Sequence, residues 1–333
     1  MATQWLRRAW LLAACASALL LTACGGGGSI ASQLDPTRVI AFGDATGDVG
    51  QVPGQTGGRY TVNDGSINVW TQFVANAYGK ELKASSQGGL GYAAGNARIV
   101  AKPDAAGSSA TLTVQEQIDA FLASNTFGTN DLVLVSAGTS DVIVQAQAAI
   151  AGSISEDQAL INADQAARDL AAQVRRIVNA GARHVVVAGV RNIGVTPWAS
   201  ETGRGPLLQR LSSVSGNTGE NQPRAFNERL LVEMADLGSS VLYIETASYF
   251  MVVASNPGGN ALDNVTEVAC TSVDSGAGIG TGANQVNSHD CSTSTLRAGI
   301  DYTRWLFADR VYLTPRGQQL LGDVARIKIR ERW

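Results

Sequence analysis

Charge, aromatic rings and histidine are all scarce in this chain of 333 residues. Charged residues make up 16% of it and aromatic residues 6%, and it contains two histidines. The formal net charge is -3, so the chain lacks the basic excess typical of a nucleic-acid partner. A hydrophobic content of 45% and a mean hydropathy near zero exclude a disordered, fibrous or multi-span membrane protein and indicate a globular one.

A long apolar stretch lies at the N-terminus. Arg7 and Arg8 precede apolar residues 9–21, which are too few to span a bilayer comfortably, and small residues then lead to Cys24. This pattern predicts a signal peptide over residues 1–23. The tetrapeptide Leu-Thr-Ala-Cys that ends at Cys24 resembles the lipobox of bacterial lipoproteins. The resemblance implies that Cys24 is lipidated and becomes the mature N-terminus.

We therefore expect a lipid-anchored protein of the bacterial cell envelope, whose partner is a membrane. Residues 24–36 supply a flexible Gly/Ser tether, and two or more acyl chains attach a protein stably, unlike one. Because Gly25 rather than an aspartate follows the cysteine, the resemblance favours the outer membrane. The alternative is an ordinary secretory signal that ends near a chance cysteine.

The four cysteines separate by position. Cys15 would leave with the signal peptide, and Cys24 would carry lipid. Cys270 and Cys291 remain in an oxidising compartment, and we predict that they form a disulfide. The alternative for this spacing is a metal-binding pair assisted by nearby His289.

From residue 37 onward, short apolar runs alternate with helical patterns. Runs rich in branched residues, typical of parallel strands covered on both faces, lie at 39–42, 132–135, 184–190 and 241–244. Helices are expected at 67–78, 114–123, 156–179 and 223–235. Thr113 with Glu116 forms a capping box, and Thr314 with Pro315 begins a last helix.

This alternation predicts a doubly wound α/β domain with a central parallel sheet. No internal repeat and no Pro-rich linker divides the sequence after the tether, so residues 37–333 are expected to form a single domain. Residues 256–295, rich in Gly and Ser, are long for a loop and are expected to form a surface insertion stapled by the disulfide.

Ligands of such sheets bind beyond the carboxyl ends of the strands, so the loops there are informative. Residues 42–50, after the first strand, read Phe-Gly-Asp-Ala-Thr-Gly-Asp-Val-Gly. Residues 92–97 read Tyr-Ala-Ala-Gly-Asn-Ala, and residues 138–141, after the second strand, read Gly-Thr-Ser-Asp. Near the C-terminus, residues 309–312 read Asp-Arg-Val-Tyr and run into the last helix.

These four segments, in this order, resemble the sequence blocks of the GDSL or SGNH hydrolases, a family of esterases and lipases. The family's blocks read Phe-Gly-Asp-Ser-Leu-Ser-Asp-x-Gly, a glycine-containing second block, Gly-x-Asn-Asp and Asp-x-x-His. The resemblance covers nearly the whole mature chain and implies a flavodoxin-like, three-layer α/β/α domain. In the family a serine attacks an acyl carbonyl, a histidine takes its proton, and an aspartate orients that histidine.

The differences from the family fall on the catalytic atoms. The resemblance places Ala45 at the serine, Tyr312 at the histidine and Ser140 at the oxyanion-binding asparagine. Ala45 has no nucleophilic atom, and a phenol, whose ordinary pKa is about 10, is a poor base at neutral pH. Asp309 is the only triad member retained, and Gly95 keeps the glycine whose backbone N–H would bind the oxyanion.

Other residues could in principle restore the chemistry. Thr46 carries the nearest hydroxyl, but it lies one position along the turn, so its side chain should point elsewhere. His184 opens a buried strand and is expected to be structural. His289, beside Asp290, is the alternative base, because the insertion is long enough to fold over the pocket.

Carboxylates are the other candidate group. Asp44, Asp48, Asp141 and Asp309 come from loops that should converge at one edge of the sheet, and clustered carboxylates bind hard cations such as calcium. We favour the alternative that they brace the loops by accepting backbone N–H bonds. We expect no metal and no cofactor, and we expect Asp44, Thr46 and Asp141 to lie at the pocket.

Two functions remain. The first is a degenerate member of the esterase family, a membrane-anchored pseudoenzyme with a ligand-binding or scaffold role, for which a small acyl or glycan molecule is the fitting ligand. We favour it because three essential positions are substituted together. The alternative is an active carboxylic-ester hydrolase that uses a different nucleophile or base. The sequence carries no signal for the oligomeric state.

Overall fold

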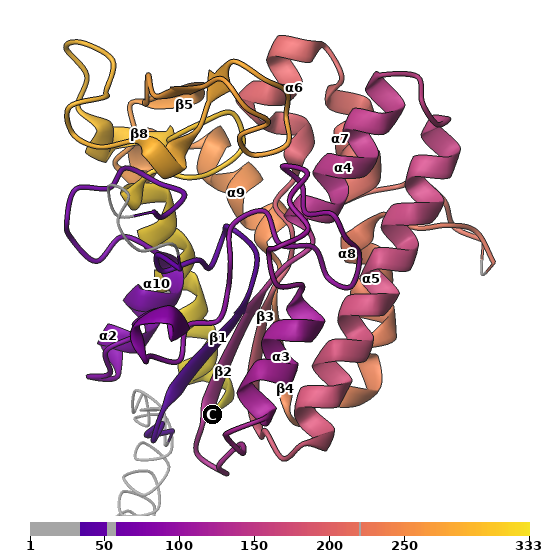
Figure 1. Cartoon of the computed structure of the whole chain (residues 1–333), viewed down its shortest axis with the longest axis vertical. Coiled ribbons are helices and arrows are strands. Elements are labelled where there is room, and N and C mark those ends of the chain that lie inside the picture. The colour runs from indigo at the N-terminus through magenta and orange to yellow at the C-terminus, as the bar shows by residue number, and fades with distance from the viewer. Residues whose placement is uncertain (1–33, 52–57, 220) are drawn as a thin grey trace, which may run out of the picture.

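The computed structural model describes residues 34–51, 58–219 and 221–333. Within these ranges the centre is a parallel sheet of four strands that lie in chain order (Figure 1). The strands are β1 (Val39–Gly43), β2 (Leu132–Ser136), β3 (His184–Ala188) and β4 (Val241–Ile244). The parallel sheet predicted from the apolar runs is therefore confirmed.

Helices cover both faces of the sheet, which gives three layers (Figure 1). The helices of the described ranges are α2 (Trp70–Ala77), α3 (Val114–Leu122), α4 (Thr139–Ile150), α5 (Glu156–Asn179), α6 (Pro197–Thr202), α7 (Gly205–Ser212), α8 (Phe226–Glu233), α9 (Thr246–Ser255) and α10 (Pro315–Arg332). Alternate strand residues point to opposite sides: Ile40 and Phe42 pack with α3, α4 and α5, whereas Val39 and Ala41 pack with α2 and α10. Each strand is thus buried on both faces, as its continuous apolar run requires.

Side-chain caps begin the helices where the sequence predicts them. Thr113 accepts a hydrogen bond from the Glu116 N–H at 3.2 Å, and the Glu116 carboxylate accepts one from the Thr113 N–H at 2.8 Å. Thr314 accepts from the Gly317 N–H at the start of α10. The predicted strand 184–190 ends early, at Ala188, because the Asn227 side chain binds both the N–H and the C=O of Val190.

The insertion at residues 256–295 is more regular than a surface loop. Its strand β5 (Asn264–Val268) pairs with β8 (Trp305–Phe307), and β6 (Val273–Asp274) pairs with β7 (Gln285–Val286). The predicted disulfide between Cys270 and Cys291 is confirmed, with a Cα–Cα distance of 5.9 Å. The segment lies above the carboxyl end of the sheet (Figure 1).

The first described residues lie at the opposite end of the sheet. The Leu34 N–H donates to the Trp333 carbonyl at 3.1 Å, and the Thr37 N–H donates to the Asn130 carbonyl at 2.9 Å, just before β1 and β2 begin. The signal peptide, Cys24 and most of the tether fall outside the described residues. Among the described residues, no helix is long and apolar enough to cross a membrane.

Candidate functional site

The turn after β1 buries the position where the family carries its nucleophile. Ala45 is 1% exposed. Asp44 beside it is fully buried, and its two carboxylate oxygens accept from the Thr46 N–H and the Thr139 N–H, both at 2.9 Å. Burial raises the pKa of Asp44, and these bonds oppose that rise. Asp44 therefore ties the loop after β1 to the start of α4 instead of facing a ligand.

Tyr312, at the position of the family's histidine, is part of the core. It is 1% exposed, and its ring packs on that of Tyr60 with centroids 5.4 Å apart. The hydroxyls of Tyr312 and Ser140 are both buried, and within the described residues neither makes a hydrogen bond of good geometry. Burial raises the pKa of Tyr312 well above its ordinary value, mainly through the cost of removing the phenolate from water. A buried neutral phenol cannot act as a general base.

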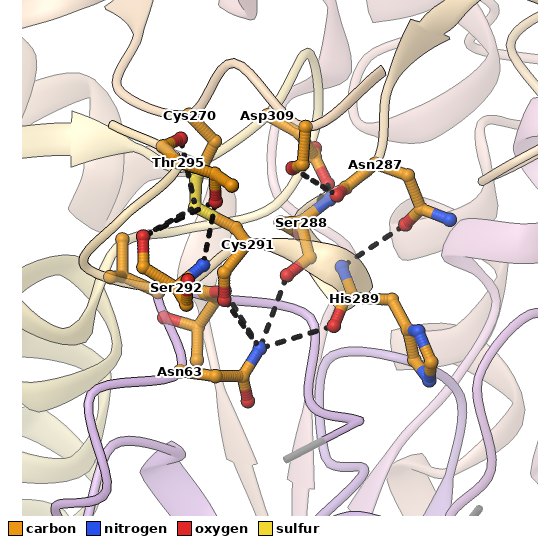
Figure 2. The surroundings of a disulfide bond; sticks show 12 residues. Asn63, Cys270, Asn287, Ser288, His289, Cys291, Ser292, Thr295 and Asp309 are labelled. Atoms are coloured by element: carbon orange, nitrogen blue, oxygen red, sulfur yellow. Dashed lines mark hydrogen bonds between the residues drawn. A yellow bond between two sulfur atoms is a disulfide. The ribbon is translucent and has the colours of Figure 1, made fainter. Parts of the chain in front are cut away.

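Asp309 is retained, but its oxygens are occupied (Figure 2). One oxygen accepts from the Val311 and Tyr312 N–H groups at 2.8 and 2.7 Å. The other accepts from the N–H and the hydroxyl of Ser288, which belongs to the insertion. Ser288 thus binds the carboxylate oxygen that a histidine would need as its acceptor. Burial raises the pKa of Asp309, and these hydrogen bonds oppose that rise.

The glycine of the second block is also engaged. The Gly95 N–H, which the resemblance assigns to the oxyanion, donates to the Asp48 carboxylate at 2.7 Å. Asp48 accepts as well from the N–H groups of Gly50 and Gln51, and burial raises its pKa to about 6. Tyr60 lies so close that a Cβ on residue 95 would be 2.2 Å from its ring. Only glycine fits there, and its N–H already has an anionic acceptor.

A cavity of about 840 Å³ opens beside these groups. Asp48, Tyr60 and Gly95 form part of its wall, and His289 lines it from the insertion. Ala45, Ser140 and Tyr312 are not among its lining residues. The structure therefore keeps a cavity of ligand size next to a filled catalytic position.

His289 is held in place through its ring and through its backbone, and Figure 2 shows the backbone contacts with Asn63 and Asn287. Its ring Nδ1 lies 2.8 Å from the Asp290 carboxylate, and its ring centroid lies 5.3 Å from that of Tyr60. The Asn63 side-chain amide donates to the carbonyls of Ser288, His289 and Cys291 at 3.0–3.3 Å. The insertion therefore does fold over the pocket and places a histidine at it.

The remaining candidates lie apart from the cavity. His184 packs on Trp333 with centroids 4.9 Å apart, at the amino end of the sheet, and burial lowers its pKa. Asp141 accepts from Arg98 Nε at 3.1 Å and from the Ile99 N–H at 3.0 Å. Burial raises the pKa of Asp141 to about 6, although the Arg98 charge opposes it.

The four aspartates brace loops, as the sequence analysis favours. Each accepts a backbone N–H bond from a segment distant in sequence: the donors to Asp44, Asp48, Asp141 and Asp309 are Thr139, Gly95, Ile99 and Ser288 respectively. In the part of the chain that the structure describes, no three His, Cys, Asp or Glu residues are placed to hold a metal ion together. Asp44 and Asp141, which the sequence analysis assigns to the pocket, are not among the lining residues, and neither is Thr46.

Sequence reasoning missed Tyr60 and Ser288, and it did not identify the residue that Asp48 contacts. Asp48 stands in the first block but carries no sign there that it binds Gly95. Tyr60 and Ser288 lie outside all four blocks and reach the site only through the fold. For Ser288, the adjacent pair His289 and Asp290 is the one local signal that could have drawn attention to it.

The fold and the four segments define an α/β/α domain of the esterase type. The model of the GDSL-like Lipase/Acylhydrolase family matches residues 39–324, and the chain belongs to this family. The chain is also similar to Lipase 1 of Photorhabdus luminescens, with 30% identity over 165 residues. The match covers 48% of this chain and 23% of that lipase, so the chain spans less than a quarter of its relative's length.

Proposed function

We propose that this protein is a lipid-anchored, catalytically degenerate member of the GDSL family that binds a ligand in its cavity. The observation that carries the proposal is the burial of Ala45 at the nucleophile position, since it is 1% exposed and has no reactive atom. Tyr312, which replaces the base, is equally buried and packs on Tyr60. Both side chains are therefore part of the hydrophobic core.

The hydrogen bonds that Asp309 and Gly95 already make support the same conclusion. Catalysis in this family needs a carboxylate free to orient a histidine and a backbone N–H free to bind the oxyanion. Asp309 instead accepts two bonds from Ser288, and Gly95 donates to Asp48. Loss of a nucleophile or base alone removes several orders of magnitude in rate, and here four groups are changed or occupied.

The position of Leu34, the first described residue, supports a cavity that faces away from the membrane. Leu34, where the described chain begins, lies at the amino end of the strands, beside Trp333. The cavity opens at the loop that follows the carboxyl end of β1. A chain anchored through Cys24 would thus present the cavity on the side away from the membrane, where a ligand can enter.

A second candidate function is ester hydrolysis that uses His289 as the base. The observation that favours it is the His289–Asp290 contact of 2.8 Å at the cavity wall. Two of the cavity hydroxyls donate elsewhere, however: Ser86 donates to the Gln51 carbonyl and Thr111 donates to Asp104. Within the described residues, none of them bonds to the imidazole.

Labelling and turnover separate the two candidates. The purified full-length protein should not react with a fluorophosphonate and should not hydrolyse short or long nitrophenyl esters above a blank, because it lacks an activated hydroxyl. If turnover is found, His289→Ala and His184→Ala provide a matched pair. Loss of turnover in the first variant alone would establish the second candidate and reject the proposal.

Restoring the family's residues tests the same conclusion from the other direction. Each of Ala45→Ser, Ser140→Asn and Tyr312→His alone should add almost no activity, because a serine without a base stays protonated. The triple variant should still gain almost no activity, because Ser288 keeps Asp309 from orienting the new histidine. Adding Ser288→Ala frees Asp309, so the fourfold variant should be the first to hydrolyse an ester measurably. Equal activity in a single variant and the fourfold variant would contradict this account of the site.

A further inference from the structure

The charge of the cavity limits what can bind there. Asp48 and Asp104 both form part of its wall, and none of the described residues that line it is a lysine or arginine. Asp104 is held rigidly, since one oxygen accepts from the Ala106 and Ser108 N–H groups and the other from the Thr111 hydroxyl at 2.6 Å. A fatty acid or a phosphate ester would bring its charge close to two fixed carboxylates. Such a like-charge arrangement disfavours an anionic ligand.

The uncharged lining residues favour a ligand with many hydroxyl groups. Six of the lining side chains are neutral and polar, namely Gln51, Ser85, Ser86, Asn96, Ser108 and Thr111. The hydroxyls of Ser86 and Thr111 already donate within the protein, but each keeps a lone pair that can accept from a sugar hydroxyl. Leu112 is the one large aliphatic side chain among the described lining residues, and it is 45% exposed. An acyl chain gains affinity by burying its surface against apolar side chains, and the wall offers it the two tyrosine rings, three alanines and Leu112. The two fixed carboxylates, and not a lack of apolar surface, are therefore what disfavours a fatty acid.

Two tyrosines supply aromatic rings to the wall. The Tyr92 ring is stacked on Phe42 at 5.5 Å and meets Phe121 edge-on at 5.8 Å, and Tyr60 is packed against Gly95 and Tyr312. Held tyrosines offer a flat apolar surface with a polar tip at low entropic cost. Sugar rings have the matching chemistry, because their faces carry C–H groups and their edges carry hydroxyls.

We infer that the cavity binds an uncharged saccharide of about two or three sugar units, a size that fits pockets of this volume. The observation behind it is the placement of rigid tyrosines, neutral hydrogen-bonding side chains and fixed carboxylates around one cavity of about 840 Å³. The inference rests on the proposed function, because a ligand must be retained rather than hydrolysed.

Calorimetry with the full-length protein at neutral pH tests this inference. The neutral probes are maltotriose, cellotriose, xylotriose and tri-N-acetylchitotriose, and the anionic probes are trigalacturonate and octanoate. At least one neutral trisaccharide should bind with a Kd below about 1 mM, and both anionic probes should bind about tenfold more weakly or not at all. Tighter binding of octanoate or trigalacturonate, or no neutral binding at about 10 mM ligand, would overturn the inference.

Two variants at the cavity wall, Ala110→Trp and Ser108→Lys, test whether a bound saccharide occupies this site. Ala110→Trp fills the cavity from its exposed rim and should abolish binding, whereas Ala123→Trp, exposed at the end of α3 and outside the lining, should leave it unchanged. Ser108→Lys adds a cation to the wall and should shift selectivity toward trigalacturonate by about tenfold. Binding that survives Ala110→Trp would place the saccharide elsewhere and overturn the inference.

Nitrophenyl ester hydrolysis is measured on the same preparations. No turnover together with no saccharide binding rejects the saccharide and leaves the loss of catalysis intact. Turnover together with saccharide binding that Ala110→Trp removes rejects the loss of catalysis and leaves the ligand class intact.

Discussion

Asp48 links the energetics of the site to pH. It is 2% exposed, accepts three backbone N–H bonds, and its pKa is raised from 3.8 to about 6 by burial. That rise corresponds to about 3 kcal/mol against the ionised form in the folded protein. Since the folded pKa lies above the unfolded one, the folded state holds the proton more tightly between about pH 4 and pH 6. The Asp48 contribution to the free energy of unfolding should therefore be present below about pH 4 and lost as the pH rises through about 6.

Asp48→Asn isolates this contribution, because an amide does not ionise. The amide NH₂ must replace one accepting oxygen and face a backbone N–H, which costs about 1–3 kcal/mol at every pH. The variant should thus be less stable than the wild type at about pH 4.5, and the deficit should shrink or reverse by about pH 8. Urea unfolding followed by tryptophan fluorescence measures the difference, in which the other titrating groups cancel.

Asp35→Asn is the matched control for that series, because Asp35 is exposed. Its difference from the wild type measures the effect of a carboxyl-to-amide change at an exposed position, and it is subtracted from that of Asp48→Asn at each pH. A pH-independent difference for Asp48→Asn would then refute the assignment of a buried, reluctantly ionised carboxylate to this position.

Three further changes test other parts of the molecule. Tyr312→Phe removes a buried hydroxyl without a good partner, so it should leave the free energy of unfolding unchanged or raise it by up to about 1 kcal/mol. Tyr312→Ala should lower that free energy by about 3–5 kcal/mol. A large loss of stability in the Phe variant would show that the hydroxyl has a role. Replacing Cys270 and Cys291 together by alanine removes a disulfide whose cysteines are 21 residues apart in sequence, and it should lower the free energy of unfolding by about 3 kcal/mol in denaturant. Proteolysis of this variant should start in the insertion. Cleavage that starts in the central sheet would contradict the prediction. Cys24→Ala should move the protein from the membrane to the soluble fraction, and an unmodified cysteine in the N-terminal peptide by mass spectrometry would reject lipidation.

Much of the fold was predictable because its determinants are local. A strand covered on both faces must be apolar throughout, so residues 132–135 already indicate β2. The caps at Thr113 and Thr314 are also contained within a few residues. The helices α4 and α9 were harder to predict, since α4 (Thr139–Ile150) follows Gly138, which supplies no side-chain cap, and α9 is rich in β-branched and aromatic residues.

The state of the site was not predictable, because the contacts that decide it are distant in sequence. Which residues occupy the positions of the family's blocks is visible in the sequence, and so is the absence of a hydroxyl at Ala45. That Ser288 binds Asp309, 21 residues later, and that Asp48 binds Gly95, 47 residues later, depends on how the insertion and the loops pack. Hydrogen-bonding capacity of an aspartate says nothing about which donor reaches it.

The substitutions at the site depend on one another through packing and hydrogen bonding. A histidine at position 312 would be buried beside an aspartate whose oxygens are already used, and an unpartnered donor there costs about 1–3 kcal/mol. The tyrosine found there instead buries a large ring against Tyr60. Tyr60 in turn contacts Gly95 and His289 and lines the cavity. The packing of Tyr312 and Tyr60 that fills the catalytic position therefore also forms one wall of the cavity. The loss of the catalytic site and the presence of the cavity follow from this single arrangement of side chains.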